Sequence, residues 1–207
     1  MVDKHAVALV LDEIGTLLDL LGENRFRAGA FHTAARELDR IEGDIETLIR
    51  SGELASVRGF GPVTVAVARE LVETGDAAFH RDLRERTPSG LVDMLRIPGL
   101  GARRIHALHV ALGVDTLADL EAAAREGRVA ELRGFGEKTQ RAILDGLAYV
   151  GKTTGRRRQN VAYQVAARLI GTLERVDSVH DVRLAGELRR RLETVDGVDV
   201  LAIVDDE

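Results

Sequence analysis

The sequence predicts a mainly α-helical protein made of repeated helix–turn–helix units, followed by a short α/β segment. Apolar residues recur at helical spacing through most of the first 175 residues. A Gly-x-Gly turn leads into such a run three times, with first glycines at Gly59, Gly99 and Gly134, 40 and 35 residues apart. Repetition of one turn at this spacing indicates repeated supersecondary units. Towards the end of the chain, alternating apolar residues are typical of strands instead.

The first predicted part, residues 1–75, is a small four-helix unit. An amphipathic helix is expected at 4–21 and ends at Gly22. Asn24 is placed to cap a second helix that runs to Ile41. A short helix at 45–49 follows, and the helix after the first glycine turn ends near Gly75.

The second predicted part, residues 76–151, contains the other two glycine turns. A helix around Phe79 and Leu83, a turn at 87–90 and a short helix to Leu95 come before the second glycine turn. After that turn's helix, Thr116 and Asp119 have the spacing of a capping box, which predicts a helix through residue 124. The third glycine turn and its helix complete this part.

The third predicted part, residues 152–207, holds a polar stretch, a helix at 159–175 and two strands near 176–185 and 198–204. The helix is expected to turn four apolar residues inward, namely Val161, Val165, Leu169 and Leu173. Because two strands make a poor independent sheet, the strands are expected to need a second copy, as in a homodimer, or another protein partner.

Composition narrows the class of protein. A hydrophobic content of 45% supports a packed core, and 3% aromatic residues disfavour recognition of single strands by stacking. The absence of cysteine excludes disulfides and thiolate zinc sites. Without an apolar run of bilayer length or a signal-peptide pattern, we expect a cytoplasmic protein with no membrane contact.

Positive charge is concentrated around the second and third glycine turns. The net charge of the chain is −5, which argues against a protein that coats nucleic acid generally. Residues 95–168, however, carry 13 Lys and Arg against 7 Asp and Glu, a balance of +6. An ordinary fluctuation in a highly charged helical protein would also explain this balance.

The second glycine turn is predicted to hold a phosphate. Gly99 and Gly101 leave the backbone bare for close approach and open a helix whose N-terminal N–H groups attract anions. Arg103 and Arg104 add positive charge in the first helical turn. The alternative is that the glycines only connect helices, and the threefold repetition makes this less favoured.

Several stretches carry a resemblance to a known family. They are residues 22–27, 31–36, 87–91 and 134–139, together with Gly186-Glu187-Leu188-Arg189-Arg190 and the run 196–200. The glycine turns resemble helix-hairpin-helix DNA-binding motifs, and their order resembles the N-terminal region of bacterial-type family X DNA polymerases, followed by a degenerate start of the palm. The fold class is therefore mainly α, with tandem helix-hairpin-helix units and a short C-terminal α/β stub.

The resemblance implies DNA, duplex or gapped, as the partner, and backbone phosphates as the groups contacted. The residues expected to bind DNA are the three turns and the cations beside them: Gly59, Phe60, Gly61, Gly99, Leu100, Gly101, Arg103, Arg104, Gly134, Phe135, Gly136, Lys138 and Arg141. Glu137 should make the third turn weaker than the second, because its charge competes with phosphate. The resemblance also implies a monovalent cation, potassium or sodium, at the hairpins, and no other cofactor.

Departures from the family pattern predict that polymerase chemistry is lost. The family's palm has a serine where this chain has Glu187, and its metal-binding Gly-Asp-x-Asp falls on residues 196–199, so that Gly197 replaces the first ligand. Asp199 survives as a vestigial ligand, and a third carboxylate comes later in the family than Glu207. Two-metal catalysis needs several fixed oxygen ligands. We therefore expect no metal site and no polymerase activity.

Abasic-site lyase activity, found in some members, is also not expected. The resemblance places the Schiff-base lysine at Val67, with Val63 one turn earlier. Lys138 is an alternative nucleophile, although a phosphate-contacting or solvated lysine explains it better. His106 and His109 have the spacing of metal ligands but are interpreted as surface or boundary residues. The three arginines at residues 156–158 either contact phosphate or begin a solvated helix.

The sequence therefore predicts a non-catalytic, sequence-independent DNA-binding protein, with a role in DNA repair. Two alternatives stay open: a protein-interaction module derived from a polymerase, and a residual abasic-site lyase.

Overall fold

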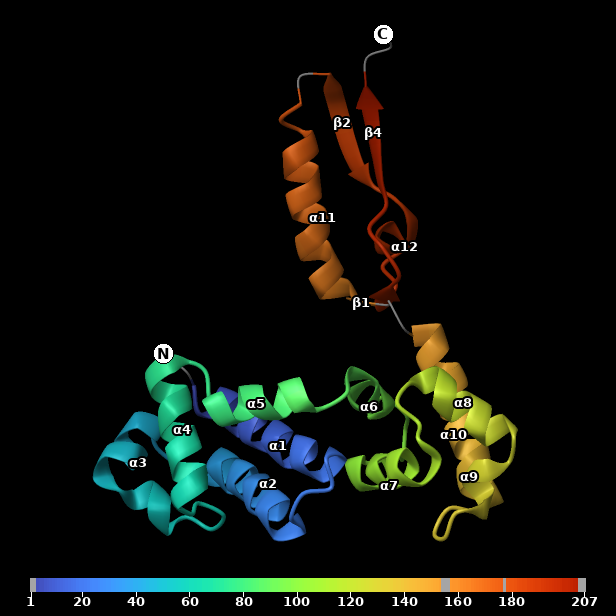
Figure 1. Cartoon of the computed structure of the whole chain (residues 1–207). Helices are drawn as coiled ribbons and strands as arrows, with labels where there is room; N and C mark the ends of the chain where they lie inside the picture. Colours follow the sequence, from blue (N-terminus) through green and yellow to red (C-terminus); the bar gives the residue numbers. More distant parts are fainter. Residues whose placement is uncertain (1–2, 154–156, 177, 205–207) are drawn as a thin grey trace. The chain divides into compact units, whose positions relative to one another are not determined.

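The structure is a computed structural model that describes residues 3–153, 157–176 and 178–204. The chain divides into two compact units, Met1–Ala148 and Tyr149–Glu207. Helices make up nearly all of the first unit, and short strands appear in the second (Figure 1). The predicted mainly α fold with a C-terminal α/β stub is confirmed. The further division of the first unit near residue 75 stays a prediction.

The first unit begins with the predicted group of helices. Its elements are α1 (Lys4–Leu20), α2 (Arg25–Arg40), α3 (Ile45–Ser51), the 3-10 turn η1 (Glu53–Ser56) and α4 (Pro62–Thr74). The side chains of Asp3, Asn24 and Asp44 accept backbone N–H groups in the first turns of α1, α2 and α3. The helices α1 and α2 lie side by side (Figure 1), and Leu11 and Phe31 are buried in the core.

The same unit continues through the second and third glycine turns. Its further elements are α5 (Ala78–Arg86), α6 (Ser89–Met94), α7 (Ala102–Leu112), α8 (Leu117–Arg125), α9 (Arg128–Glu131) and the first part of α10 (Glu137–Thr153), which continues into the second unit. The capping box of Thr116 and Asp119 is confirmed at the start of α8. The end of α1 contacts α7, where Nδ1 of His106 lies 3.0 Å from the carbonyl oxygen of Leu20. This contact ties the first helices to the helix that follows the second glycine turn.

The second unit combines one long helix with short strands. Its elements are β1 (Arg157–Arg158), α11 (Gln159–Leu173), β2 (Val179–Leu184), α12 (Gly186–Arg189), β3 (Thr194–Val195) and β4 (Val200–Val204). The strands β2 and β4 pair antiparallel with Val182 opposite Ala202, and β1 pairs antiparallel with β3. The two predicted strands are thus confirmed. Arg156, the first of the three arginines singled out in the sequence, lies outside the described residues.

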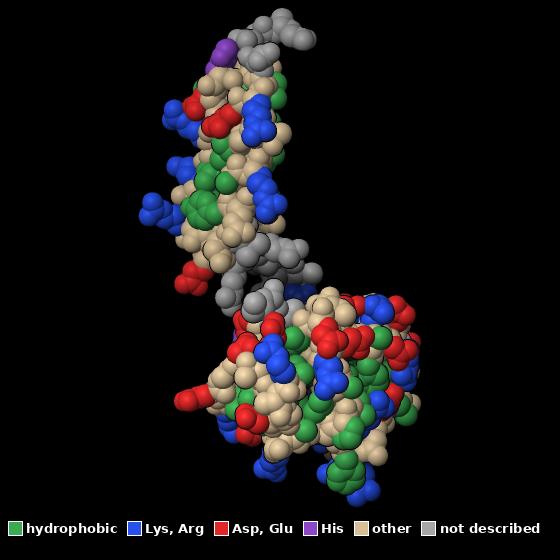
Figure 2. Space-filling view, turned by 90° about the vertical axis from the view of Figure 1, so that its left-hand side faces the viewer, with side chains coloured by type: hydrophobic (Ala, Val, Ile, Leu, Met, Phe, Trp, Pro, Cys, Tyr) green, Lys and Arg blue, Asp and Glu red, His purple; other side chains and the backbone are tan. Residues whose placement is uncertain are grey.

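The predicted inward face of α11 is wrong at Val165 and Leu169; Leu173 is half-buried, and the side chain of Val161 lies outside the described part of the structure. Val165 is 52% exposed and Leu169 is 37% exposed, whereas Ala162 and Ala166 are buried against Leu188. Hydrophobic side chains accordingly appear on the surface of this unit between Lys and Arg side chains (Figure 2). Two apolar stripes run along α11, one residue apart in the sequence. Periodicity favoured the stripe of larger residues, but the helix packs through the alanines.

Candidate phosphate-binding interface

Each glycine turn closes with the same backbone hydrogen bond. The N–H of Leu100 donates to the carbonyl oxygen of Ile97 at 3.1 Å, and Phe60 and Phe135 make the corresponding bond at 3.0 Å. The first glycine of each turn has a positive φ, between +78° and +89°. This combination is a type II turn, which needs glycine at its third position. Three copies of one local structure are therefore present, as the repeated sequence predicts.

The middle residues of the turns point inward. The side chains of Phe60 and Leu100 are 5% and 4% exposed, and Phe135 is half-buried. A ligand at the surface therefore cannot contact the first two side chains, and the prediction that they bind DNA is corrected for those side chains. They anchor each turn to the core and so fix the position of the glycines beside them.

The first turn is closed by its own threonine. The hydroxyl oxygen of Thr64 lies 2.8 Å from the backbone N of Gly61, which donates to it, and 3.0 Å from the carbonyl oxygen of Gly59. A Cβ added at Gly59 would lie 2.5 Å from the backbone N of Ala34, so this glycine packs directly on α2. The prediction of two bare amides here is wrong for Gly61. Thr64 occupies the third position of α4, where a capping role was readable from the sequence.

The second turn is open. A Cβ added at Gly99 or Gly101 would meet no atom within 4 Å, and both residues are exposed. Among the described residues, neither backbone N–H has a hydrogen-bond partner. Gly101 has φ −84° and caps α7, an 11-residue helix. The bare backbone predicted for this turn is therefore present, at a helix N-terminus whose partial charge favours anions.

The third turn differs in its second glycine. Gly136 has φ +85°, whereas Gly61 and Gly101 are extended at −94° and −84°. A left-handed residue directly before the helix changes the direction of the amide that follows. The three turns therefore share their first half only, and the third presents its backbone differently from the second.

A hollow of about 230 Å³ joins the second turn to α10. It is lined by Pro98, Gly99, Leu100, Arg104, Lys138, Thr139, Ala142 and Ile143. Neither Arg104 nor Lys138 makes an ion pair with any described residue. Two cations 34 residues apart in the sequence thus border one concave surface beside the bare amides of the turn.

Close packing of α10 on the second turn brings these cations together. A Cβ added at Gly146 would lie 2.6 Å from Cγ2 of Ile97, which is buried, and 3.4 Å from Cδ of Pro98. Only glycine allows this approach without displacing the turn. Sequence analysis missed Gly146, because a lone glycine inside a helical pattern gives no indication of its neighbour.

Arg103 is placed differently from the prediction. Its Nε lies 3.0 Å from Oδ1 of Asp19 in α1, and the Asp19 side chain is 12% exposed. The other oxygen of Asp19 lies 3.7 Å from Nε2 of His32. A largely buried carboxylate therefore already neutralises Arg103, and the cation ties α7 to α1. Arg141, the remaining predicted cation, is exposed on α10.

Two family models match the chain in the regions just described. Residues 2–77 match a helix-hairpin-helix domain, and residues 91–148 match a SAM-like helix-hairpin-helix tandem. The chain carries tandem helix-hairpin-helix domains. Helix-hairpin-helix domains imply DNA binding, so the predicted partner class is confirmed at that level.

A curated relative extends the likeness over nearly the whole chain. DNA polymerase/3'-5' exonuclease PolX of Bacillus subtilis (strain 168) is 31% identical over 202 residues, which cover 98% of this chain and 35% of the relative. The predicted resemblance to the N-terminal region of a bacterial family X polymerase is confirmed. The chain spans about a third of the length of that relative.

The palm-like residues of this chain lie together in the second unit. The carboxylate of Glu187 accepts the backbone N–H of Asp196 at 2.8 Å, and a Cβ added at Gly186 would lie 1.9 Å from Oδ2 of Asp199. Gly197 supplies no side-chain oxygen, and no cluster of three metal-ligating side chains occurs within the described residues. These residues do not fit a two-cation site.

The remaining candidates have structural partners in the first unit. Val67, at the lyase position of the family, is 4% exposed, while Val63 is 50% exposed. Nδ1 of His109 lies 2.8 Å from Oδ1 of Asp115, and His106 contacts the end of α1.

No helix in the part of the chain that the structure describes is long and apolar enough to cross a membrane.

Proposed function

We propose that this protein binds DNA without sequence specificity, through contacts to backbone phosphates at the second hairpin and the start of α10. The observation that carries the proposal is the hollow beside the Gly99–Gly101 turn. There, Arg104 and Lys138 form no ion pair with a described residue, and the amides of Gly99 and Gly101 have no hydrogen-bond partner among these residues. Amides and cations that contact phosphate position a strand but read no bases. The first hairpin, closed by Thr64, serves mainly to hold the fold together.

A monovalent cation fits the second hairpin better than the first. The carbonyl oxygens of Pro98, Gly99 and Leu100 accept no hydrogen bond from any described residue, whereas the hydroxyl of Thr64 already contacts the carbonyls of Gly59 and Gly61. Carbonyl oxygens are suitable ligands for hard cations. A potassium or sodium ion held by the second turn would add positive charge where a phosphate approaches.

A salt titration of binding to duplex, gapped and single-stranded DNA tests the proposal. Releasing counterions from each phosphate contact contributes about 0.9 to the slope of log K against log salt concentration. We expect Arg104→Gln and Lys138→Gln each to lower the magnitude of that slope by about 0.9. Parallel titrations in potassium and tetramethylammonium chloride test the cation, because the larger ion cannot replace potassium at carbonyl ligands.

Arg125→Gln is the matched control for this titration. Arg125 is exposed on α8 and pairs with Glu121 at 2.6 Å, so its loss should leave the slope unchanged. A flat salt dependence in the wild-type protein would contradict phosphate binding. Equal effects of all three substitutions would contradict the assignment to the hollow.

We propose further that the protein acts in DNA repair without catalysing a reaction. The relative that supports a repair role is named as a polymerase and exonuclease, and those activities belong to that protein. The absence of a first palm ligand at Gly197 and the buried Val67 at the lyase position support a non-catalytic role here.

Borohydride trapping on an abasic duplex examines the remaining nucleophile. Lys138 lines an open hollow, and no residue in the described part of the chain pairs with its amine to activate it, so we expect no covalent adduct. An adduct that disappears in Lys138→Ala would instead establish the lyase alternative.

A further inference from the structure

Side chains of α1, α2 and α7 meet around the imidazole of His32. Asp12, Gly15 and Asp19 are three and four residues apart on α1, so they share one face of that helix. His32 comes from α2. Its Nδ1 lies 2.7 Å from Oδ1 of Asp12, and its Nε2 lies 3.7 Å from Oδ2 of Asp19. Because Arg103 of α7 binds the other oxygen of Asp19 at 3.0 Å, the imidazole lies between two carboxylates of which one already has a cation.

A glycine in α1 brings the ring this close to the helix. A Cβ added at Gly15 would lie 2.8 Å from Cε1 of His32 and 2.9 Å from both ring nitrogens. A side chain there would displace the ring from its place between the two carboxylates. The His32 side chain is 25% exposed, so protons reach it from solvent.

In its neutral form the ring bonds to one of the two carboxylates. Nδ1 carries the proton, because this nitrogen lies at hydrogen-bond distance from the carboxylate of Asp12, which can only accept. Nε2 then presents a lone pair toward Asp19, and 3.7 Å is too long for a hydrogen bond. Among the described residues, Arg103 is then the cation that pairs with Asp19.

A second proton on the ring changes what Asp19 can bind. Imidazole takes up this proton in the mildly acidic range, where carboxylates stay ionised. The new Nε2–H can donate to Oδ2 of Asp19 after a small movement of the side chains. Asp19 is only 12% exposed, so losing Arg103 is costly unless another cation compensates its charge. The charged form of His32 supplies that compensation.

Charged groups of the surrounding helices have other partners. On α5, His80 and Arg84 pair with Glu13. His106 of α7 bonds to a carbonyl oxygen at the end of α1, and Arg36, one turn further along α2, donates to a threonine hydroxyl. No ion pair joins a described residue of α4 to this cluster. The two carboxylates and the cation of α7 are therefore the charges, among the described residues, that respond to the imidazole.

We propose that protonated His32 replaces Arg103 as the partner of Asp19 and so releases Arg103 to a DNA phosphate. This inference rests on the proposed function, because it adds a pH-dependent cation to the second hairpin. Near neutral pH and above, Arg103 stays on Asp19, and DNA is held by Arg104 and Lys138. In mildly acidic solution a third cation becomes available in the first turn of α7, beside the exposed backbone of the glycine turn.

DNA affinity of the full chain at about pH 8 and about pH 5.5 tests this exchange of partners. We expect Arg103→Gln to weaken binding by less than about twofold at the higher pH and by about fivefold at the lower one. In the His32→Gln background the same substitution should cost less than about twofold at both, because glutamine gains no charge. Fluorescence anisotropy with a labelled duplex at one salt concentration measures each affinity.

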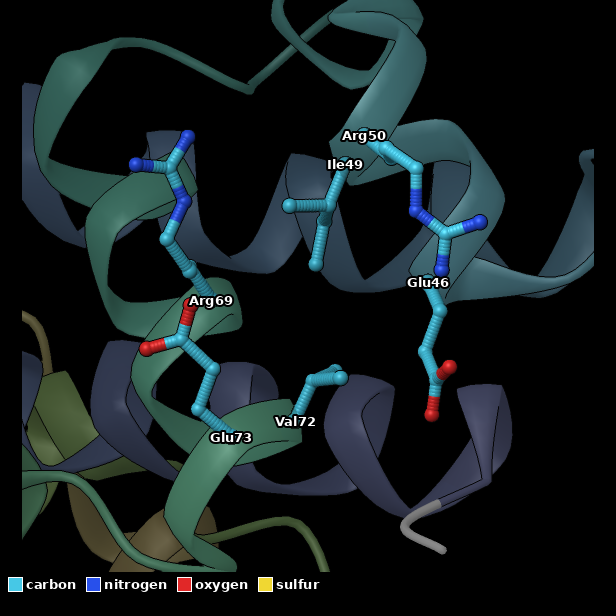
Figure 3. A pocket seen from close by; sticks show the side chains of 6 residues that line it. All are labelled: Glu46, Ile49, Arg50, Arg69, Val72 and Glu73. Atoms are coloured by element: carbon cyan, nitrogen blue, oxygen red, sulfur yellow. The ribbon is translucent and has the colours of Figure 1, made fainter.

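Two control variants separate this effect from a general response to pH. His5→Gln removes another histidine that lies beside an aspartate, 3.2 Å from Asp39, and should leave the pH dependence of Arg103→Gln unchanged. Arg69→Gln removes an arginine from a hollow of about 500 Å³ between α3 and α4, to which each helix contributes one guanidinium and one carboxylate (Figure 3). None of the described residues that line this hollow is a histidine, so the effect of Arg69→Gln should be equal at both pH values. Circular dichroism at both pH values establishes that the variants fold.

A measurement without DNA examines the release of Arg103 by itself. Nuclear magnetic resonance of the free protein follows the exchange of the Arg103 Nε–H with water. At about pH 5.5 we expect this exchange to be about threefold faster in the wild-type protein than in His32→Gln, because the ion pair with Asp19 is weakened. At about pH 8 the two proteins should exchange this proton at the same rate.

Three results would overturn the inference. They are an effect of Arg103→Gln that is equal at both pH values, a pH-dependent effect that persists in His32→Gln, and an Arg103 exchange rate that His32→Gln leaves unchanged in acidic solution. If the protein fails to bind DNA at either pH, the proposed function is wrong. The exchange rate of Arg103 then decides alone whether His32 takes its place on Asp19.

Discussion

At the scale of single residues, the ion pair with Asp19 distinguishes Arg103 from the neighbouring Arg104. The carboxylate is only 12% exposed and would be left largely uncompensated if Arg103 moved to a phosphate. The pair is neutral at a distance, so Arg103 contributes little to the attraction of a polyanion. Arg104, one residue further along α7, lacks such a partner and lines the hollow instead. Two neighbouring arginines thus have different roles.

A double-mutant cycle measures this difference. In the wild-type background we expect Arg103→Gln to change DNA affinity by less than about twofold, whereas in Asp19→Asn it should cost about fivefold. Asp12→Asn is the matched control, because it removes the same charge from α1 as Asp19→Asn does. Oδ1 of Asp12 lies 2.7 Å from Nδ1 of His32, and Asp12 does not pair with Arg103. A large effect of Arg103→Gln in both backgrounds would show that Asp19 does not mask the cation.

At the scale of elements, local hydrogen bonds decide where helices begin and how the turns differ. The capping box of α8 is an example with a pH dependence. The hydrogen bond from the Thr116 hydroxyl, followed by the backbone N–H of Asp115, holds the pKa of Asp119 below its ordinary value. In the first hairpin a threonine bonds to the backbone instead: the Thr64 hydroxyl accepts the N–H of Gly61 and donates to the carbonyl oxygen of Gly59. Among the described residues, no side chain closes the second hairpin in this way.

Substituting Thr116→Ala should raise the pKa of Asp119 toward the ordinary aspartate value. A depressed carboxyl pKa stabilises the fold above the unfolded-state pKa, and that contribution is lost as the pH falls through the folded-state pKa. The wild-type protein should therefore lose stability over this acidic window, and the variant should lose less. Carboxyl carbon shifts of Asp119 measured against pH follow the titration, and identical midpoints would contradict the assignment.

At the scale of the whole molecule, the two units differ in how much core they contain. The second unit has a small buried cluster of Ala162, Ala166, Leu188 and Val195, with Tyr163, Leu184 and Val198 packed against it. The first unit buries large side chains on several helices, including Leu11, Phe31, Leu38 and Leu83. Fewer buried apolar contacts leave a region closer to local unfolding.

Hydrogen exchange of the intact chain should reveal this difference. We expect the amides of β2 and β4 to exchange faster than those of α1 and α2, since the small core of the second unit gives less free energy against opening. Mass spectrometry of peptides from both units compares them under one condition. Equal protection would indicate that the strands gain stability from a partner, as the sequence analysis predicts for a two-stranded sheet.

The sequence by itself determined the local structure of this protein. Glycine at a type II turn, a capping side chain before a helix and a run of apolar residues act within a few positions, so the helices, the three repeated turns and the late strands were all predictable. The same local reasoning pointed to the backbone at Gly99–Gly101.

Only the tertiary structure decided which of these features face a ligand. Thr64 and α2 close the first hairpin, Asp19 takes Arg103, Gly146 brings Lys138 beside Arg104, and α11 packs through its alanines. Most of these outcomes depend on contacts between residues far apart in the sequence. Two stripes or two turns of similar chemistry differ in which one packs against a neighbouring element closely enough to exclude water. A local sequence pattern contains no information on that neighbour.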